Sequence, residues 1–348
     1  MITAELVKDK VIINNAKDAS RIYNKSRIGK PLSNNKLEID LIEAVFLSEE
    51  EKIQIFQKNK KISFQKLVDF AAKKITNFLT KYLIYKDIRS RGYAIKLHTQ
   101  NNDITFINIE RKNNNAEKQF FLSTFSERNC FDIKETFKLI EYSNKSNRFL
   151  WYAILDEEGD ITYYDISKPD FFGEIKKYVL PKTKGFIFKD RVIVFDKKNS
   201  DKLFEKEFFG KPFGKGLQLS YVEALFLSKK GFLDIYSNSA KITKNKLYDI
   251  VKKSQSDIDD RFKVYNDLKN RGFIVKTGFK FGSHFRVYSQ KPDITHAEYL
   301  VHIISEDYRG FWSDISRAVR LAHSVNKEIV FAVVNKKIRY IKLGRLRP

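Results

Sequence analysis

The chain has 348 residues, 42% hydrophobic and 14% aromatic, so it is long enough for two domains with real cores and is not a disordered protein. Lys and Arg total 66 against 43 Asp and Glu, and the resulting net charge of +23 favours a polyanionic partner, either nucleic acid or an anionic membrane surface. The single cysteine, Cys130, excludes an internal disulfide, a Cys-based zinc finger and an iron–sulfur cluster. No apolar run approaches 18 residues and the N-terminal sequence has no leader pattern, so we expect a cytoplasmic protein that does not span a membrane.

Segments of the first half of the sequence return 180 residues later. The stretch Leu41–Ser48 (LIEAVFLS) returns as Tyr221–Ser228 (YVEALFLS), and Tyr85–Lys96 returns as Tyr265–Lys276 around a shared Arg-Gly pair. A period of this length is too long for a solenoid. The matches therefore predict a tandem duplication, with a first copy and a second copy joined near residues 168–190.

Both copies have the same predicted order of elements. A short β-rich start at residues 11–13 or 192–195 leads into the apolar helix that holds the Glu-Ala pair of the repeat. One mixed-charge helix follows, with apolar residues at helical spacing from Tyr248 to Tyr265, and it ends at the Arg-Gly pair, where Gly is the usual residue after a helix. Alternating strands come next, at 272–276 and 285–288 in the second copy.

The last part of the second copy is predicted to contain two further helices. Thr295–Glu298 has the pattern of a capping box, and Ala297, Leu300, Val301 and Ile304 share one helical face behind it. A second helix is expected at 313–325, and strands at 328–334 and 338–342. The predicted fold class is α/β (α+β), in which each copy has a small α/β N-terminal domain followed by a helix-flanked mixed-sheet domain.

Three reactive side chains of the second copy fall at ends of these predicted elements. Tyr288 ends a strand, His296 is the first residue of the predicted helix, and Lys327 lies between a helix and a strand. Such ends converge in an α/β sheet, and a helix N-terminus favours an anion such as phosphate. Taken singly, each residue is more often structural, because a strand-end tyrosine, a surface histidine and a lysine at a helix C-terminus are all ordinary.

Comparison of the two copies favours a site in the second copy only. Sliding the copies past one another places Asn108 opposite Tyr288, Asn115 opposite His296 and Arg148 opposite Lys327. The first copy keeps the scaffold and lacks the tyrosine and the histidine. We therefore expect one reactive copy and one structural copy.

Three motifs of the second copy resemble those of the archaeal tRNA-splicing endonucleases in their fused two-repeat form. They are Phe281-Gly-Ser-x-Phe-x-Val-Tyr288, His296-Ala-x-Tyr-Leu-Val301 and Arg320-x-Ala-x-Ser-Val-x-Lys327. The resemblance covers nearly the whole chain, since the Glu-Ala helix and the Arg-Gly junction belong to it. It implies cleavage of precursor tRNA at a bulge–helix–bulge without metal or cofactor, leaving a 2′,3′-cyclic phosphate and a 5′-hydroxyl. It also assigns roles: Tyr288 as base toward the 2′-hydroxyl, His296 as acid to the leaving oxygen, and Lys327 as the cation beside the charged phosphorane.

The resemblance further implies a homodimer. The first copy has an acidic loop made by Asp156, Glu157, Glu158 and Asp160, whereas the second copy has Asn335-Lys-Lys337 at the equivalent turn. In the family such a loop docks into a basic cleft on the active repeat of the partner subunit, and charge complementarity of this kind selects the partner. The alternative is an ordinary Asp-rich turn.

The resemblance also implies a site for an unpaired base. Arg320 corresponds to an arginine that stacks on a flipped base together with a second cation, for which we choose Arg345 over Lys342. A tail that is merely solvated or contacts phosphates is the alternative, since residues 336–347 hold six basic side chains.

Five regions are expected from this organisation. They are a first N-terminal α/β domain (1–96), a degenerate nuclease-like domain (97–167), a linker region (168–190), a second N-terminal domain (191–271) and a catalytic nuclease domain (272–348). A metal-dependent nuclease would need an Asp and a Glu-x-Lys on adjacent strands; Asp293 is present but no Glu-x-Lys follows on a strand. A non-catalytic RNA-binding or assembly subunit is the other alternative, and cleavage in the presence of EDTA distinguishes the three.

Overall fold

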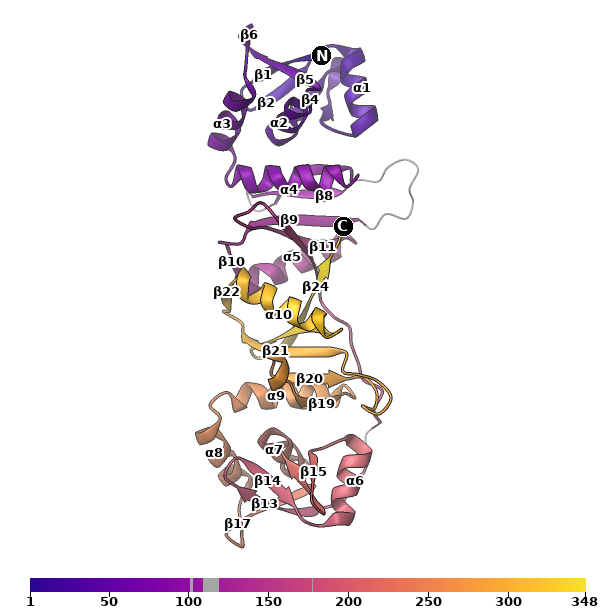
Figure 1. The fold of residues 1–348 in the computed structure, drawn as a ribbon, viewed down its shortest axis with the longest axis vertical. Coiled ribbons are helices and arrows are strands. Elements are labelled where there is room, and N and C mark those ends of the chain that lie inside the picture. The colour runs from indigo at the N-terminus through magenta and orange to yellow at the C-terminus, as the bar shows by residue number, and fades with distance from the viewer. Residues whose placement is uncertain (101–102, 109–118, 177) are drawn as a thin grey trace. The chain divides into compact units, whose positions relative to one another are not determined.

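The computed structural model describes residues 1–100, 103–108, 119–176 and 178–348 (Figure 1). The chain divides into two units. The first unit contains Met1–Ser167 with Arg309–Ser316 and Arg345–Pro348, and the second contains Lys168–Tyr308 and Arg317–Gly344. Within the described ranges, no helix combines the length and the apolar character needed to cross a membrane.

Each unit has a six-stranded sheet near its start, and both sheets have the same topology. The strand order is β3-β4-β2-β1-β5-β6 in the first unit and β15-β16-β14-β13-β17-β18 in the second. In both sheets one central pair is parallel, β1 with β5 and β13 with β17. This identity confirms the duplication. The strands are β1 (Ile2–Val7), β2 (Lys10–Ile13), β3 (Lys30–Pro31), β4 (Leu37–Asp40), β5 (Ile53–Gln57) and β6 (Lys60–Lys61), then β13 (Thr183–Phe188), β14 (Arg191–Val194), β15 (Lys211–Phe213), β16 (Gly216–Leu219), β17 (Leu233–Ser237) and β18 (Ala240–Lys241).

Four helices accompany each of these sheets. They are α1 (Ala16–Ser26), α2 (Leu41–Glu49), α3 (Phe64–Lys74) and α4 (Phe78–Ser90), then α6 (Lys197–Glu207), α7 (Tyr221–Lys229), α8 (Lys244–Ser254) and α9 (Ile258–Asn270). The single mixed-charge helix predicted before the Arg-Gly pair is wrong, because the segment forms two helices. Gln255 adopts an extended conformation at the end of α8, and α9 starts afresh at a buried Ile258.

The Glu-Ala pair of the repeat has a structural function in both copies. Glu43 and Glu223 are buried third residues of α2 and α7 and complete a capping box. Each carboxylate also accepts a backbone N–H from a distant turn, Gly29 at 3.1 Å or Gly210 at 2.8 Å. Burial raises the pKa of Glu43 to about 7. These glutamates therefore hold helix, turn and sheet together rather than act on a ligand.

A second mixed sheet follows the helices in each unit. In the first unit the order is β12-β11-β9-β8-β7, and in the second it is β19-β20-β21-β23-β24. A helix, α5 or α10, connects parallel neighbours in each case, β9 with β11 and β21 with β23. Short strands β10 and β22, both in the first unit, pair with each other. The elements are β7 (Ile95–Gln100), β8 (Asp103–Asn108), β9 (Phe120–Ser126), β10 (Cys130–Asp132), α5 (Ile133–Lys145), β11 (Phe149–Leu155), β12 (Ile161–Ser167), β19 (Ile274–Thr277), β20 (Phe285–Tyr288), β21 (Tyr299–Ser305), β22 (Arg309–Phe311), α10 (Trp312–Ser324), β23 (Glu328–Val334) and β24 (Ile338–Leu346), with short 3-10 turns η1 (Ser33–Asn35) and η2 (Phe279–Phe281).

The helix predicted to begin at Thr295 is wrong. Residues Tyr299–Ser305 form strand β21, which lies between antiparallel β20 and parallel β23. A strand paired on both sides and covered on both faces carries apolar residues at consecutive positions, so its pattern imitates a buried helix. The predicted helix at 313–325 and the strands after it are confirmed.

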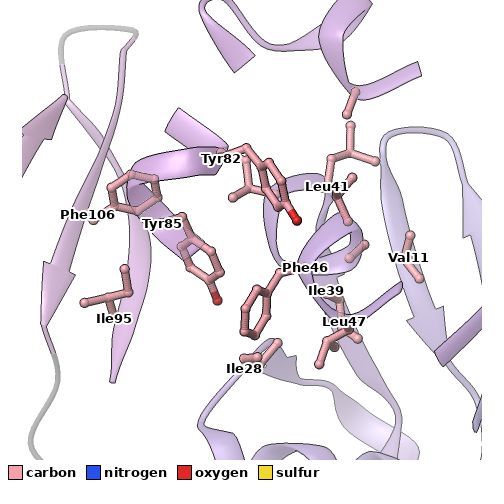
Figure 2. Packing of buried hydrophobic residues seen from close by; sticks show 14 of the residues in the cluster. Val11, Ile28, Ile39, Leu41, Phe46, Leu47, Tyr82, Tyr85, Ile95 and Phe106 are labelled. Atoms are coloured by element: carbon pink, nitrogen blue, oxygen red, sulfur yellow. The ribbon is translucent and has the colours of Figure 1, made fainter. Parts of the chain in front are cut away.

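An aromatic contact joins the two sheets of each unit into one core. In the first unit the Tyr85 ring lies 5.6 Å from the rings of both Phe46 and Phe106 (Figure 2). In the second unit Tyr265 makes the matching contacts with Phe226 and Phe285. Because each tyrosine stands on the helix between the two sheets, burial of these rings fixes one sheet against the other.

The Arg-Gly pair is also structural. Arg91 pairs with Asp87 at 2.7 Å, and the same carboxylate accepts the hydroxyl of Tyr163 at 2.6 Å. In the second copy Arg271, Asp267 and Tyr340 repeat this arrangement at 2.7 and 2.8 Å. The Asp–Arg–Tyr contact attaches the helix that precedes the second sheet to the last strand of that sheet.

Candidate active site

Three strand ends of the second unit meet at one edge of its second sheet. Strand β20 ends at Tyr288, while β21 and β23 begin at Tyr299 and Glu328, which are paired with each other. Two backbone bonds fix this edge: the amide of Glu298 donates to the carbonyl of Val287 at 3.1 Å, and that of Glu328 donates to the carbonyl of Glu298 at 2.9 Å. The ends of β20, β21 and β23 therefore bring the segments around residues 288, 296 and 327 to the same edge.

Tyr288 is held firmly at this edge. Its side chain is 8% exposed and packs with Phe208, Ile274 and Ala297. Tyr288 also contributes to the wall of a cleft of about 740 Å³ within the second unit. Packing on one side and a cleft on the other give the ring a defined orientation while leaving space beside it.

Sequence reasoning missed Arg286, which shares the face of Tyr288. The two residues alternate with the core residue Val287 on β20, and the Arg286 guanidinium lies 5.9 Å from the centre of the Tyr288 ring. Its Nε is buried without a hydrogen-bond partner. The period of two along a strand was the signal that could have placed a cation beside Tyr288.

His296 lies in the loop that enters β21, and its side chain is exposed. The loop is shaped by turns in which the amides of Ile294 and Thr295 donate to the carbonyl of Lys291, at 2.9 and 3.1 Å. A hydrogen bond between Ser289 and Glu298 closes the loop across its base. Because no helix starts here, the expected contribution of a helix N-terminus to anion binding at His296 is wrong as well.

Lys327 occupies a tight turn between α10 and β23. Its amide donates to the carbonyl of Ala322 at 2.9 Å, after Asn326 with a φ of +53°. Its ammonium group donates to the carbonyl of Val325 at 3.1 Å and lies 5.5 Å from the ring of Phe281. Lys327 also lines a pocket of about 380 Å³ with Glu298 and Tyr299. A cation held by its own backbone beside an open pocket is suited to a phosphate.

The predicted base-stacking residues are both exposed. Arg320 stands on the outer face of α10 in the second unit, and Arg345 stands near the end of β24 in the first unit. The alternative cation, Lys342, forms an ion pair with Glu328 at 2.9 Å.

The acidic loop joins β11 and β12. The carboxylate of Asp156 accepts the amides of Glu158 and Asp160, at 3.0 and 2.8 Å, so this residue shapes the turn. Glu157 pairs with Arg128 on the surface at 2.5 Å. Glu158 is exposed at the tip, and Asp160 is exposed at the base of the turn, where its carbonyl accepts the amide of Asp156 at 3.0 Å.

The strand register corrects one expectation about the first copy. Asn108 pairs with Ile95, whereas in the second copy the matching partner, Val275, pairs with Val287. Asn108 therefore corresponds to Val287, one residue away from the expected match with Tyr288, because the β7–β8 and β19–β20 hairpins differ by one residue in length. Asn115, expected opposite His296, lies outside the described residues. The expected match of Arg148 with Lys327 agrees with the structure, because each residue follows the same kind of turn. The amide of Arg148 donates to the carbonyl of Ser143 at 2.9 Å, and the amide of Lys327 donates to the carbonyl of Ala322 at 2.9 Å.

Among the residues that the structure describes, no three His, Cys, Asp or Glu side chains are grouped so that they could hold a metal ion.

Family comparisons agree with this organisation. The family model described as tRNA intron endonuclease, N-terminal domain, matches residues 2–68 and again 183–248. The model described as tRNA intron endonuclease, catalytic C-terminal domain, matches residues 78–163 and 258–340. Fold and matches together define a duplicated endoribonuclease.

The chain belongs to the tRNA intron endonuclease family. It is 36% identical to a protein named tRNA-splicing endonuclease from Methanococcoides burtonii, over 99% of both chains, and 31% identical to one of the same name from Methanosarcina mazei, over 100% of this chain and 99% of that one. A relative from Thermococcus onnurineus, also named tRNA-splicing endonuclease, is 34% identical over 44% of this chain and 93% of its own length. That relative has the length of about one copy, which agrees with a duplicated architecture.

Proposed function

We propose that the chain cleaves precursor tRNA at intron boundaries presented as a bulge–helix–bulge. The observation that supports this proposal is the convergence, at one sheet edge, of the backbone segments that carry Tyr288, His296 and Lys327. The names of the relatives supply the substrate class. The net charge of +23 supports an RNA substrate as well.

The proposed reaction needs only RNA and side chains. The phenolic oxygen of Tyr288 removes the proton of the 2′-hydroxyl, and the 2′-oxygen attacks the adjacent phosphorus. The bond from phosphorus to the 5′-oxygen breaks as His296 donates a proton to that oxygen, which gives a 2′,3′-cyclic phosphate and a 5′-hydroxyl. Lys327 stabilises the extra charge on the phosphorane. Since the nucleophile belongs to the substrate, correct positioning supplies much of the rate.

Arg320 and Arg345 are proposed to stack on an unpaired base of the bulge. Their exposure supports this role, because a guanidinium must have a free face to stack on a base. The ion pair of Lys342 with Glu328 favours Arg345 over Lys342 as the second cation.

The active form is proposed to be a homodimer in which the acidic loop of one chain docks on the other. Asp156 shapes the loop, and Glu158 and Asp160 are exposed, so these two carboxylates are proposed to make the contact. The assignment of 272–348 as the catalytic domain and of 97–167 as its degenerate counterpart also stays a prediction.

The test is cleavage of a bulge–helix–bulge RNA in EDTA by the wild type, His296→Ala and Lys327→Ala. We expect cyclic-phosphate ends from the wild type and rates lowered about 10²-fold or more in both variants. The control is His98→Gln, a first-copy histidine whose hydrogen bond to Tyr142 a glutamine can keep. RNA that is bound but left intact, with or without Mg²⁺, would show that the chain is a binding subunit and that the site assignment is wrong.

The dimer is tested separately by light scattering. The wild type should have twice the chain mass of 41.0 kDa, and Glu158→Lys with Asp160→Lys should lower it toward one chain. A variant that stays dimeric and fully active would refute docking through the loop.

A further inference from the structure

The N-terminal sheet of the second unit has two different faces. Its core face carries residues such as Val192, Leu217 and Ile235, which pack in one cluster with α6, α7 and α8. Successive side chains of a strand point to opposite faces. The other face therefore presents Phe186 and Phe188 from β13, Phe195 just after β14, and Tyr236 from β17.

These four rings form one cluster, here called the aromatic face. The ring centre of Phe186 lies 5.5 Å from that of Phe195 and 5.7 Å from that of Tyr236, and Phe188 lies 6.2 Å from Phe195. Phe188 is 51% exposed and Phe195 is 55% exposed. Phe186 and Tyr236 are half-buried, so the cluster combines two exposed rings with two that support them. Adjacent exposed rings are unfavourable in water and are typical of a contact surface.

Positive charges accompany the aromatic face. The ammonium group of Lys184, one step along β13, lies 5.5 Å from the centre of the Tyr236 ring. Next to it, Lys182 and Lys241 both approach Asp234, at 3.4 and 3.0 Å, and leave one net positive charge. Flat rings for stacking beside cations for phosphates are the combination that binds single-stranded RNA on a sheet.

The first copy shows that the fold does not require this face. Strand register places Thr3 where the second copy has Lys184, Glu5 where it has Phe186, and Val7 where it has Phe188. Asn14 stands where the second copy has Phe195, just after the strand. Of the four ring positions, only that of Tyr236 holds a ring in the first copy, where the residue is Phe56. The same sheet forms without the cluster, so a structural need does not explain it.

We propose that the aromatic face binds single-stranded RNA, with unpaired bases stacked on its rings and Lys184 against a phosphate. The surface lies on the N-terminal domain, on strands that carry none of the residues assigned to cleavage. The inference rests on the proposed function only in taking precursor tRNA as the RNA that supplies the unpaired strand.

The test measures binding of a fluorescein-labelled single-stranded RNA of about 12 nucleotides to the full chain by anisotropy. Phe188→Val and Phe195→Asn introduce the residues that the first copy holds at the same places, so both fit the sheet. We expect the Kd to rise about 10-fold for each and further for the pair. Lys184→Thr should lower the slope of log K against log salt by about 0.7, the value for one phosphate contact with a single strand.

The matched controls are Val7→Thr and Asn14→Ala on the same face of the first copy, which should leave the Kd unchanged. Circular dichroism melting confirms that every variant folds. RNA carrying 5-iodouridine should crosslink under ultraviolet light to the peptides that contain Phe186, Phe188 or Phe195.

Three outcomes would overturn the proposal. One is a Kd that the second-copy variants leave unchanged, and another is crosslinking that maps elsewhere. The third is a fall in oligomeric mass with RNA binding intact, which would make the aromatic face a protein contact. Failure of this proposal can be told apart from failure of the proposed cleavage site. If the wild type cleaves and the aromatic-face variants still bind single strands normally, only the aromatic face is refuted. If the variants lose binding but the wild type never cleaves, only the cleavage site is refuted.

Discussion

The histidine pair His284 and His302 should make the second unit sensitive to mild acid. Their rings lie 4.7 Å apart, with His302 on β21 and His284 immediately before β20, and Nδ1 of His284 accepts the amide of Ile303 at 3.1 Å, which requires a neutral ring. Burial, His302 and Arg261 lower the pKa of His284 from 6.5 to about 4, while Asp257, 4.0 Å away, opposes them. In the unfolded chain the same group titrates near 6.5.

The sign follows from this difference. The unfolded chain binds a proton at His284 before the folded chain does, so the contribution of His284 to stability is present above pH 6.5 and is lost as the pH falls toward 4. A shift of about 2.5 pH units corresponds to about 3 kcal/mol, and partial exposure of the ring reduces this to about 2 kcal/mol. Half or more of that loss should be reached by pH 5.

Two measurements check the prediction. The chain has five histidines, so their Cε1–H resonances can be followed by NMR from pH 8 to pH 4 and assigned by loss of one signal in His284→Asn. Urea unfolding at pH 7 and pH 5 should show a smaller acid loss in this variant, because an asparagine oxygen can accept the Ile303 amide without titrating. His284 titrating near 6.5, or equal acid losses in both proteins, would refute the reasoning.

Two further predictions concern the packing of the second unit. The ion pair of Lys269 with Glu207, at 3.0 Å, is almost wholly buried. Glu207→Ala should lower the free energy of unfolding, measured in urea, by about 3–5 kcal/mol because it leaves an uncompensated charge. The double variant Glu207→Leu with Lys269→Met should recover most of that loss. Equal losses in the single and double variants would contradict this account. A Cβ at Gly272, where φ is +85°, would lie 2.7 Å from the carbonyl oxygen of Gly173, whereas a Cβ at Gly231, where φ is +84°, would meet nothing within 4 Å. Gly272→Ala should therefore lower the free energy of unfolding by about 3 kcal/mol and Gly231→Ala by about 1 kcal/mol. Equal losses would show that backbone strain alone is responsible.

The sequence predicted the features that depend on local pattern or on repetition. The duplication, α10 and the strands after it all agree with the structure. The helix proposed at Thr295 failed because Leu300, Val301 and Ile304 lie on a central strand with two covered faces, where strand alternation disappears. Periodicity does not separate that run from a buried helix, and its β-branched residues, Val301, Ile303 and Ile304, were the local signal for a strand.

Placement of the candidate site was predictable only in part. The end of β20 at Tyr288 and the start of β23 just after Lys327 were predicted, whereas His296 was placed at a helix start and lies in the loop that enters β21. The one-residue error at Asn108 arose because a hairpin can lose a residue without any change in the pattern on either side. Arg286 could have been placed beside Tyr288 from the alternation along β20, whereas the aromatic face depends on which strands are neighbours, and that information exists only once the sheet is assembled.

The Asp–Arg–Tyr contact, present in both copies, bears on how duplicated enzymes diverge. One of the stretches by which the two halves of this gene resemble each other, around Asp87 and Arg91 and around Asp267 and Arg271, attaches a helix to a sheet. Selection for folding acts on both halves equally, whereas selection for chemistry needs to act on one. Similarity between the halves of such a gene therefore reflects the residues that both halves need in order to fold. The half that carries the chemistry is better recognised at the positions where the two halves differ.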